Sequence, residues 1–405
     1  MSDKTVDKQN VGEKALNERT NERTNERTNE RTKEFNPLNV SSKFAICGVP
    51  IRLDSYKTCS FGCEYCFANC RTVMGFEKEV QIGNIQWLER YLKKIYEDEN
   101  VNYRNFLDVL MYQRYTWHGG GMSDPFQPIE QKYHITRQII DLANKYDVNI
   151  LFSTKSDTVY DCNIKPELHS FQLSVSNTNN RKDIEPNVPN IEKRYKFYRD
   201  LKDNGFRVGI RIQPFIPRVT NLEILDMFHD ADHFTIEGLK FVPQNEEQKR
   251  KLSKITGIWQ GDMVQMGLLN IKPEKRLRLY KPFIEKLEKM GASYSLADND
   301  LHHLGNNYCC CGDKLTHSTS INNTFLCHWY GKDYAKEQVD EELFNTNLRD
   351  CRCDYLFSSN RQEEGAETVQ DFFDRRFYRK SSPFSPQFLF DENEPIYDQL
   401  SLFGM

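Results

Sequence analysis

The sequence has no long apolar run. No stretch approaches the roughly 20 apolar residues that a helix needs to cross a bilayer, which argues against a membrane span. The chain also has no strong excess of either charge, because 55 Lys and Arg stand against 59 Asp and Glu. The electrostatic field of the whole protein therefore gives no indication of a nucleic-acid partner, although this net charge is compatible with a local basic face.

The N-terminus lacks an apolar signal region, while the chain contains twelve cysteines. This combination predicts a reducing, cytoplasmic setting, in which thiolates serve metals better than disulfides. At 405 residues the chain is long enough to bury a substantial core, and we expect one large domain with appendages.

The N-terminal segment is low in complexity, and its repeat over residues 17–32 carries almost no apolar side chain that would offset the entropy of ordering. Asn-Glu-Arg-Thr occurs four times in succession from Asn17 to Thr32, a period too short for a solenoid repeat. We therefore expect a disordered arm, with a charged tether as the alternative. Ordered sequence is expected to begin near Phe44.

Beyond the arm, strand-like apolar runs alternate with amphipathic stretches, which is typical of an α/β domain with a parallel sheet. The rhythm predicts a (β/α) barrel or partial barrel, whose catalytic groups follow the carboxyl ends of the strands. We expect strands at Phe44–Leu53, Asp108–Trp117, Asn149–Ser153, Phe171–Ser176, Arg207–Gln213 and His233–Phe241, and helices at Gln131–Tyr146 and Ile191–Asn204.

Three cysteines directly follow the first expected strand. Cys59, Cys63 and Cys66 have the spacing C-x3-C-x2-C and supply three thiolates from one short loop. A 4Fe-4S cube held there keeps one iron without a protein ligand, so that iron can bind a substrate. The alternatives on spacing alone are a structural zinc site or a disulfide knot.

Other expected strand ends also carry polar or flexible residues. His118 is followed by Gly119, Gly120 and Gly121, whose backbone can approach a ligand closely, and then by the carboxylates of Asp124 and Glu130. Lys155 is a cation suited to pairing with a ligand carboxylate. The next two strand ends supply Ser174, Ser176, Arg211 and Gln213.

The cysteine loop, with Tyr65 just before its third cysteine, resembles the cluster loop of the radical S-adenosylmethionine (SAM) superfamily. Residues 44–245 resemble the spore photoproduct lyase-like branch, often called DNA repair photolyase-like. The segments that carry this resemblance are Cys59–Cys66, Ser123–Glu130, Ser153–Ser156, Glu185–Arg194 and Val208–Pro217. The resemblance implies that the open iron chelates the amino and carboxylate groups of SAM and that one electron, from a donor such as flavodoxin or ferredoxin, releases a 5'-deoxyadenosyl radical.

The resemblance also implies roles for individual residues. Cys59, Cys63 and Cys66 would ligate the cluster, and Gly119, Gly120 and Gly121 would lie beside the amino group of SAM. The remaining cofactor contacts would come from Tyr65, Lys155, Ser174 or Ser176, and Arg211. The lyase also uses a further cysteine as hydrogen donor. Cys70 and Cys162 are the candidates here, although a buried thiol without chemistry is the commoner fate of a lone cysteine.

A second group of cysteines lies beyond the expected barrel. One or two members of the Cys309-Cys310-Cys311 triplet, with Cys327, Cys351 and Cys353, would complete a four-thiolate site for an auxiliary iron-sulfur cluster or a zinc. His302, His303 and His328 are alternative ligands.

The C-terminal segment Gln399-Leu400-Ser401-Leu402-Phe403 resembles the pentapeptide that docks bacterial DNA polymerases and repair proteins on the β sliding clamp. In this interpretation Leu402 and Phe403 fill an apolar pocket, while Gln399 hydrogen-bonds at its rim. The alternative is a terminal segment packed back on the body. Upstream, Arg375–Lys380 interleaves cations and aromatics, a pattern suited to DNA contact or to an ordinary basic helix face.

The sequence therefore predicts a disordered arm over 1–42, a radical SAM partial barrel over 43–255, a Cys-rich extension over 256–360 and a tail with the clamp peptide over 361–405. The leading interpretation is a radical SAM enzyme that repairs or modifies DNA. One alternative is a non-catalytic, clamp-associated metal-binding regulatory protein, and another is a radical SAM enzyme acting on RNA, peptide or a small molecule.

Overall fold

A computed structural model describes residues 32–40, 49–66, 68, 79–100, 105–242, 245–266, 268–298, 301–307 and 309–316, together with 367, 368 and 371. Several segments for which the sequence analysis makes predictions fall outside these residues. Among them are residues 17–31 of the repeat, the segment Arg375–Lys380 and the clamp peptide of residues 399–403.

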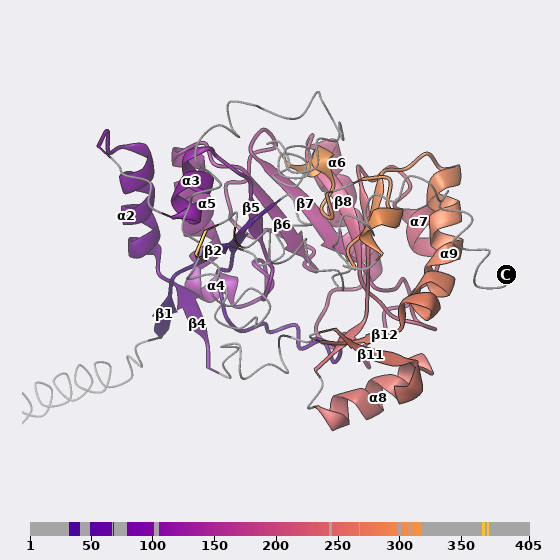
Figure 1. The fold of residues 1–405 in the computed structure, drawn as a ribbon. Coiled ribbons are helices and arrows are strands. Elements are labelled where there is room, and N and C mark those ends of the chain that lie inside the picture. The colour runs from indigo at the N-terminus through magenta and orange to yellow at the C-terminus, as the bar shows by residue number, and fades with distance from the viewer. Residues whose placement is uncertain are drawn as a thin grey trace, which may run out of the picture.

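The centre of the molecule is an eight-stranded sheet in the order β13-β9-β8-β7-β6-β5-β3-β2 (Figure 1). All neighbouring strands are parallel except the edge pair β2 and β3, which is antiparallel. This arrangement confirms the α/β class with a large parallel sheet. The strands are β2 (Leu38–Val40), β3 (Ile51–Leu53), β5 (Trp117–Gly119), β6 (Ile150–Thr154), β7 (His169–Ser174), β8 (Arg207–Phe215), β9 (Phe234–Gly238) and β13 (Tyr294–Leu296).

Helices flank this sheet, with α2, α3 and α5 towards its β2 end and α6, α7 and α9 towards its β13 end (Figure 1). Every residue of β6, β7 and β9 is buried, as expected for parallel strands that are covered on both faces. The helices are α2 (Ile85–Tyr96), α3 (Phe106–Tyr112), α4 (Glu130–Tyr133), α5 (Ile135–Lys145), α6 (Ile191–Asp203), α7 (Glu223–Met227) and α9 (Pro273–Lys289).

Aromatic side chains fill the space between the sheet and its helices. The Phe152 and Phe171 rings lie 5.6 Å apart, and Phe126, Phe197 and Phe206 pack around them with centroid distances of 5.0 to 6.1 Å. Aromatic pairs of this kind stabilise a core beyond the area that they bury. No helix in the described part of the chain combines the length and apolar character that a membrane span requires.

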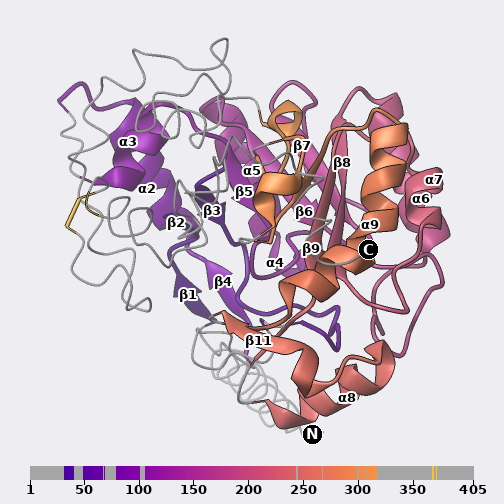
Figure 2. The same cartoon turned by 45° about the vertical axis from the view of Figure 1, so that its right-hand side comes forward.

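A smaller lobe lies below the main sheet and carries α8 (Glu246–Thr256) (Figure 2). Its antiparallel sheet has the order β10-β12-β11, with β10 at Lys240–Phe241, β11 at Met263–Met266 and β12 at Leu268–Ile271, and the short helix η2 (Gln260–Asp262) leads into β11. Leu252 of α8 and Ile258 belong to one hydrophobic cluster with Phe61, Cys63 and Tyr65. The lobe therefore supports the cysteine loop from beneath.

The main fold extends beyond residue 255, so the predicted boundary there is too early. Helix α9 follows the small lobe, and β13 then pairs with β9 in the main sheet. The short helices η3 (His302–Leu304) and η4 (Asp313–Leu315) come next. Ser170 of β7 donates a hydrogen bond to the carbonyl of Leu315, so the 309–316 segment lies against the sheet instead of forming a separate extension. A three-residue strand such as β13 gives too short a pattern to be recognised in sequence.

Other sequence expectations need correction at the N-terminal side. The expected strand Asp108–Trp117 is the helix α3, whose Asn105 cap accepts the Asp108 N–H at 2.9 Å, followed by the short strand β5. The expected helix Gln131–Tyr146 is split into α4 and α5 at His134, which has φ 52. Folded structure begins before Phe44, because β1 (Lys33–Phe35) pairs with β4 (Gln81–Gly83) and β2 pairs with β3. The expected strands over 149–153, 171–176 and 207–213 and the helix at Ile191 are present with small shifts at their ends. The expected strand His233–Phe241 is divided into β9 and β10, which belong to different sheets. Of the expected strand Phe44–Leu53 the described residues show β3, and residues 44–48 lie outside them.

Candidate functional site

A cavity of about 200 Å³ opens where the parallel strands of the main sheet end. Its walls come from segments far apart in the sequence, as the strand-end argument predicts. The cysteine loop contributes Cys59, Phe61, Cys63, Tyr65 and Cys66. Strand β5 and the turn after it contribute His118, Gly120 and Gly121. The strands from β6 to β10 and the turns that follow them contribute Lys155, Ser174, Arg211, Gln213 and Lys240.

The cysteine loop is fixed by a buried glutamine. The Gln127 amide nitrogen donates to the Thr58 carbonyl at 2.7 Å, and its oxygen accepts from the Ser60 N–H at 2.7 Å. Asn187 donates to the Ser60 carbonyl at 3.0 Å, and the Glu64 N–H donates to the Ile184 carbonyl at 2.9 Å. The loop is therefore held from two sides by segments that follow β5 and β7.

The three loop cysteines are free thiols that line one wall of the cavity. Burial raises the pKa of Cys59 to about 12, and the negative charge of Asp124 adds to the shift. Burial also raises the pKa of Cys63 to about 12, while the Lys155 ammonium group opposes the shift. Without a metal these two thiols hold their protons at neutral pH, and a metal that binds them has to displace those protons.

The donors on this wall are three thiols, the side chains of Cys59, Cys63 and Cys66. Among the described residues, no group of three His, Cys, Asp or Glu side chains has the geometry of a metal-ion site. Three soft thiolate donors on one wall of a cavity suit iron-sulfur ligation.

Tyr65 joins the cysteine loop to the segment after β7. It is buried, its hydroxyl donates to the Glu185 carboxylate, and the Ser176 hydroxyl lies 3.4 Å away. Asn177 donates to the other Glu185 oxygen at 3.3 Å. Burial raises the pKa of Tyr65 well above its usual value, with the Glu185 charge adding to it, so the phenol stays neutral and acts as a donor.

Asp124 fixes the backbone that presents Lys155. Its carboxylate accepts from the Lys155 N–H at 2.6 Å and from the Thr154 hydroxyl at 2.7 Å. The Lys155 ammonium lies 5.8 Å from the centre of the Tyr65 ring. Gly120 has φ 93, and an added Cβ would lie 2.2 Å from the Ser153 carbonyl, so the turn requires glycine at this position.

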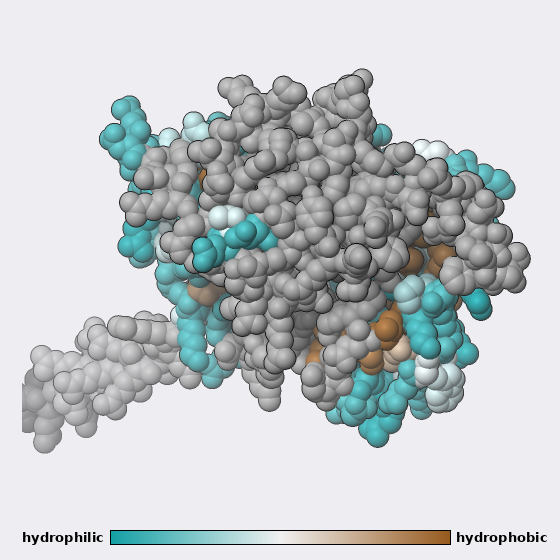
Figure 3. Space-filling view, in the orientation of Figure 1, coloured by the Kyte–Doolittle hydropathy of each residue, from teal (hydrophilic) through white to brown (hydrophobic). Residues whose placement is uncertain are grey.

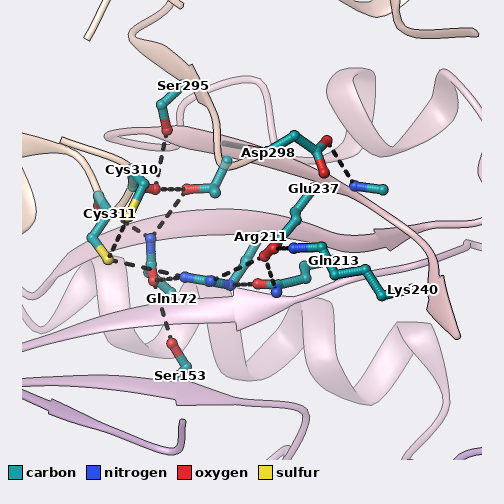
Figure 4. Close-up of polar contacts among 12 residues, drawn as sticks. Ser153, Gln172, Arg211, Gln213, Glu237, Lys240, Ser295, Asp298, Cys310 and Cys311 are labelled. Atoms are coloured by element: carbon teal, nitrogen blue, oxygen red, sulfur yellow. Dashed lines mark hydrogen bonds and ion pairs between the residues drawn. The ribbon is translucent and has the colours of Figure 1, made fainter. Parts of the chain in front are cut away.

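A polar network joins side chains that line the cavity to their buried neighbours (Figure 4). Arg211 donates to Gln172 at 3.0 Å and to Gln213, and its guanidinium lies 3.7 Å from the Glu237 carboxylate. Lys240 pairs with the same carboxylate. Arg211 and Lys240 therefore line the cavity with their positions fixed by Glu237.

The network also joins the cavity to the Cys309–Cys311 segment (Figure 4). Gln172 donates to the Cys311 carbonyl at 3.1 Å, and the Cys311 sulfur lies 4.0 Å from Arg211. Cys310 and Cys311 are buried with Leu151, Ala297 and Leu315. The other proposed ligands of a second metal site, Cys327, Cys351 and Cys353, lie outside the described residues, as does His328.

Several predicted site residues lie elsewhere. Gly119 belongs to β5, and Ser176 lies behind Tyr65, and neither is among the cavity-lining residues. Cys162 packs in the main hydrophobic core and does not line the cavity, so its expected position at the barrel mouth is wrong. Cys162 belongs to a loop and has no motif beside it, so the orientation of its side chain could not be predicted from sequence. Cys70 lies outside the described residues.

Sequence reasoning assigned no role to three residues that belong to this site. His118 lines the cavity and bonds to the Ser153 hydroxyl at 2.8 Å, and burial, with the charges of Arg211 and Arg52, lowers its pKa to about 3. Glu237 and Lys240 complete the Arg211 network. The sequence indicates these residues only by their position at the end of an apolar strand, where catalytic groups of such folds often lie.

No family model matches this chain. An uncharacterized protein of Methanocaldococcus jannaschii is 25% identical over 199 residues, which cover 48% of this chain and 68% of that protein. The solved structure of spore photoproduct lyase complexed with dinucleoside spore photoproduct has a TM-score of 0.46 at 15% identity, covering 66% of this chain and 79% of that one. Streptococcus suis SuiB bound to S-adenosylmethionine has a TM-score of 0.41 at 13% identity, covering 63% and 52%. Because both TM-scores lie below 0.5, the function of this chain has to be inferred from its own residues.

Proposed function

We propose that Cys59, Cys63 and Cys66 hold a 4Fe-4S cluster and that the cavity beside them binds SAM. A bound cluster of this kind would supply the electron that cleaves SAM reductively to a 5'-deoxyadenosyl radical. The observation that carries the proposal is that three free thiols from one loop line a cavity at the carboxyl end of a parallel sheet.

The other cavity residues supply the groups that a charged amino-acid ligand requires. Gly120 and Gly121 leave backbone open to its amino end, and Lys155 offers a cation to its carboxylate. Ser174 and Arg211 offer further polar contacts on the strands beyond. These assignments follow the sequence resemblance. Gly119 and Ser176 are excluded from them, because neither lines the cavity.

The protein's own contribution to the chemistry is position and enclosure. Gln127 and Asn187 hold the loop in one conformation, so its thiols stay on the cavity wall. Phe61 and Tyr65 are buried beside the thiols and limit access of water to them. His118 stays neutral above a pH of about 3 and so adds no positive charge near the ligand.

We propose DNA as the substrate, on the strength of the sequence resemblance and of the terminal pentapeptide, which would deliver the enzyme to the sliding clamp. RNA, peptide or a small molecule would use the same radical chemistry. Since Cys162 packs in the main core and does not line the cavity, we assign no hydrogen donor.

The test is anaerobic reconstitution with iron and sulfide, reduction by dithionite and measurement of 5'-deoxyadenosine formed from SAM. Iron and sulfide content and the electron paramagnetic resonance signal report cluster assembly separately from turnover. An assembled cluster that never releases the nucleoside would favour the non-catalytic alternative of a clamp-associated metal protein.

A further inference from the structure

A second, larger cavity lies on the small lobe, on the outer side of α8. Its volume is about 860 Å³. Four cationic side chains line it, against two acidic ones, in a chain whose net charge is −4. The cations are Arg218, Lys249, Arg250 and Lys254, and the acids are Glu246 and Glu247. In the space-filling view this lower edge of the molecule is hydrophilic (Figure 3).

An exposed indole stands at one end of this groove. Trp259 is 75% exposed, the highest value among the large hydrophobic side chains in the described part of the chain. Its neighbour Ile258 is only 3% exposed and packs in the cluster beneath the cysteine loop. The backbone at Trp259 is extended, so the two side chains point in opposite directions. A ring presented to solvent in this way contributes nothing to the core and offers a flat apolar face.

The cationic side chains of the groove differ in burial and in ion pairing. Lys249 is buried and paired with Glu246, so it is committed to the helix. Arg218, Arg250 and Lys254 are exposed and have no ion-pair partner among the described residues. Arg218 lies against Gly257, the left-handed residue that ends α8, where an added Cβ would meet its guanidinium carbon at 2.3 Å. Three exposed cations without an ion-pair partner among the described residues therefore line the groove together with one exposed aromatic ring.

We propose that this groove binds a single strand of nucleic acid, with a base stacked on Trp259 and phosphates on Arg218, Arg250 and Lys254. A cationic track with an aromatic platform is how proteins hold single strands without reading their sequence. An acidic peptide would use the cations, but it has no use for the exposed indole face. This inference rests on the groove's own residues and goes beyond the chemistry proposed for the cysteine cavity.

The groove is connected to that cavity through α8. Lys251 of α8 pairs with Glu64 at 2.7 Å, and Glu64 lies within the cysteine loop, between Cys63 and Cys66. Leu252, also on α8, packs in the same cluster as Cys63. A strand held on the outer side of α8 is therefore held on the element that supports the proposed catalytic loop.

The test is binding of a fluorescein-labelled oligothymidylate of twelve nucleotides to the full-length chain, followed by anisotropy over a series of salt concentrations without SAM or reductant. Three phosphate contacts predict a slope of log K against log salt of about −2, since each single-strand contact contributes about 0.7. Trp259→Ala should weaken binding about tenfold, whereas Trp259→Phe should retain it within about twofold because the ring remains.

The matched pair of cation variants separates this groove from other cationic surfaces. Arg250→Ala with Lys254→Ala should reduce the salt slope by about 1.4. Lys193→Ala with Lys289→Ala, which removes two exposed lysines of α6 and α9, should leave it unchanged. Unaltered binding by Trp259→Ala, or an equal loss in both double variants, would overturn the proposal. Binding of a polyglutamate peptide to the protein, together with no binding of the oligonucleotide, would also overturn it. The binding measurement uses neither SAM nor reductant, so failure of the radical chemistry is distinguishable from failure of the groove.

Discussion

The hydroxyl of Tyr65 donates a hydrogen bond to the carboxylate of Glu185, 120 residues further along the chain. This contact joins the cysteine loop to the segment that follows β7. It also connects two of the sequence segments on which the family resemblance was based. Two of the segments that carry the sequence resemblance are therefore in contact in the structure.

Replacing Tyr65 with phenylalanine should lower the amount of iron that the reconstituted protein retains. The change leaves the buried Glu185 carboxylate without its phenol donor and frees the loop to move. A lost buried hydrogen bond to a charged group costs about 1–3 kcal/mol of stability. Iron and sulfide analysis after desalting is the measurement.

Tyr198→Phe is the matched control for that variant. Tyr198 is buried and donates to Asp230 at 2.8 Å, away from the cysteine loop. Tyr198→Phe should lose less stability, because Asp230 is exposed and keeps its ion pair with Arg199, and it should retain its iron. Equal iron content in the two would mean that the Tyr65 contact does not hold the loop.

Gly120→Ala should destabilise the protein by at least about 3 kcal/mol, because left-handed strain adds to a clash with backbone. Its added Cβ would lie 2.2 Å from the Ser153 carbonyl. Gly205→Ala separates the two effects, since Gly205 has φ 81 but nothing within 4 Å. That variant should lose only about 1 kcal/mol. Urea unfolding of both proteins measures the difference, and equal losses would contradict the close approach in this turn.

Much of this architecture could be predicted from sequence, because the central strands are apolar and regularly spaced. β6, β7 and β8 and the helix α6 lie close to their expected bounds. The apolar run Phe106–Met111 was ambiguous, since every residue in it is buried and such a run suits a buried strand as well as a short helix. The Asn105 side chain accepts the Asp108 N–H and so caps the helix that this run forms.

The site itself was only partly predictable. Cys59, Lys155 and Arg211 follow recognisable strand ends and line one cavity, as expected. Gln127 and Asn187 were not predicted, because an amide that clamps a distant loop leaves no local pattern in sequence. Cys162 was misplaced for a related reason: the direction of a loop side chain depends on tertiary packing.

His233 predicts a loss of stability in acid. Burial lowers its pKa to about 3, Arg211 and Lys314 add to the shift, and Asp313 opposes it. The native state therefore excludes a proton that the unfolded chain takes up below its usual pKa near 6.5. Stability should fall as pH decreases through that value, by about 2 kcal/mol between pH 7 and pH 5 from this residue.

The measurement is urea unfolding at pH 5 and pH 7 for the wild type, His233→Gln and His229→Gln. The exposed His229 serves as the control and should leave the pH dependence unchanged. His233→Gln should reduce it by about 2 kcal/mol, even if its overall stability is lower, while the buried His118 keeps its own contribution. A pH dependence identical to that of the wild type would show that His233 takes up its proton in the folded protein.

Replacing both Leu402 and Phe403 with alanine should weaken binding to a bacterial β sliding clamp at least about tenfold, since such anchor residues carry most of a docking peptide's affinity. Release of 5'-deoxyadenosine should be unaffected. Phe390→Ala is the control, as it removes an upstream aromatic side chain outside the pentapeptide. Calorimetric titration of the clamp measures the effect, and unchanged affinity would remove the sliding clamp from the proposed function.

The central claim is that the Cys59–Cys66 loop supports radical chemistry on SAM. It is tested most directly by the yield of 5'-deoxyadenosine from anaerobically reconstituted, dithionite-reduced protein, comparing the wild type with Cys63→Ala and with Cys162→Ala. Cys162 is a buried thiol outside the cavity. We expect the nucleoside from the wild type and Cys162→Ala, and none from Cys63→Ala. No nucleoside from wild-type protein that carries iron and sulfide, with DNA present, would contradict the account, as would undiminished release by Cys63→Ala.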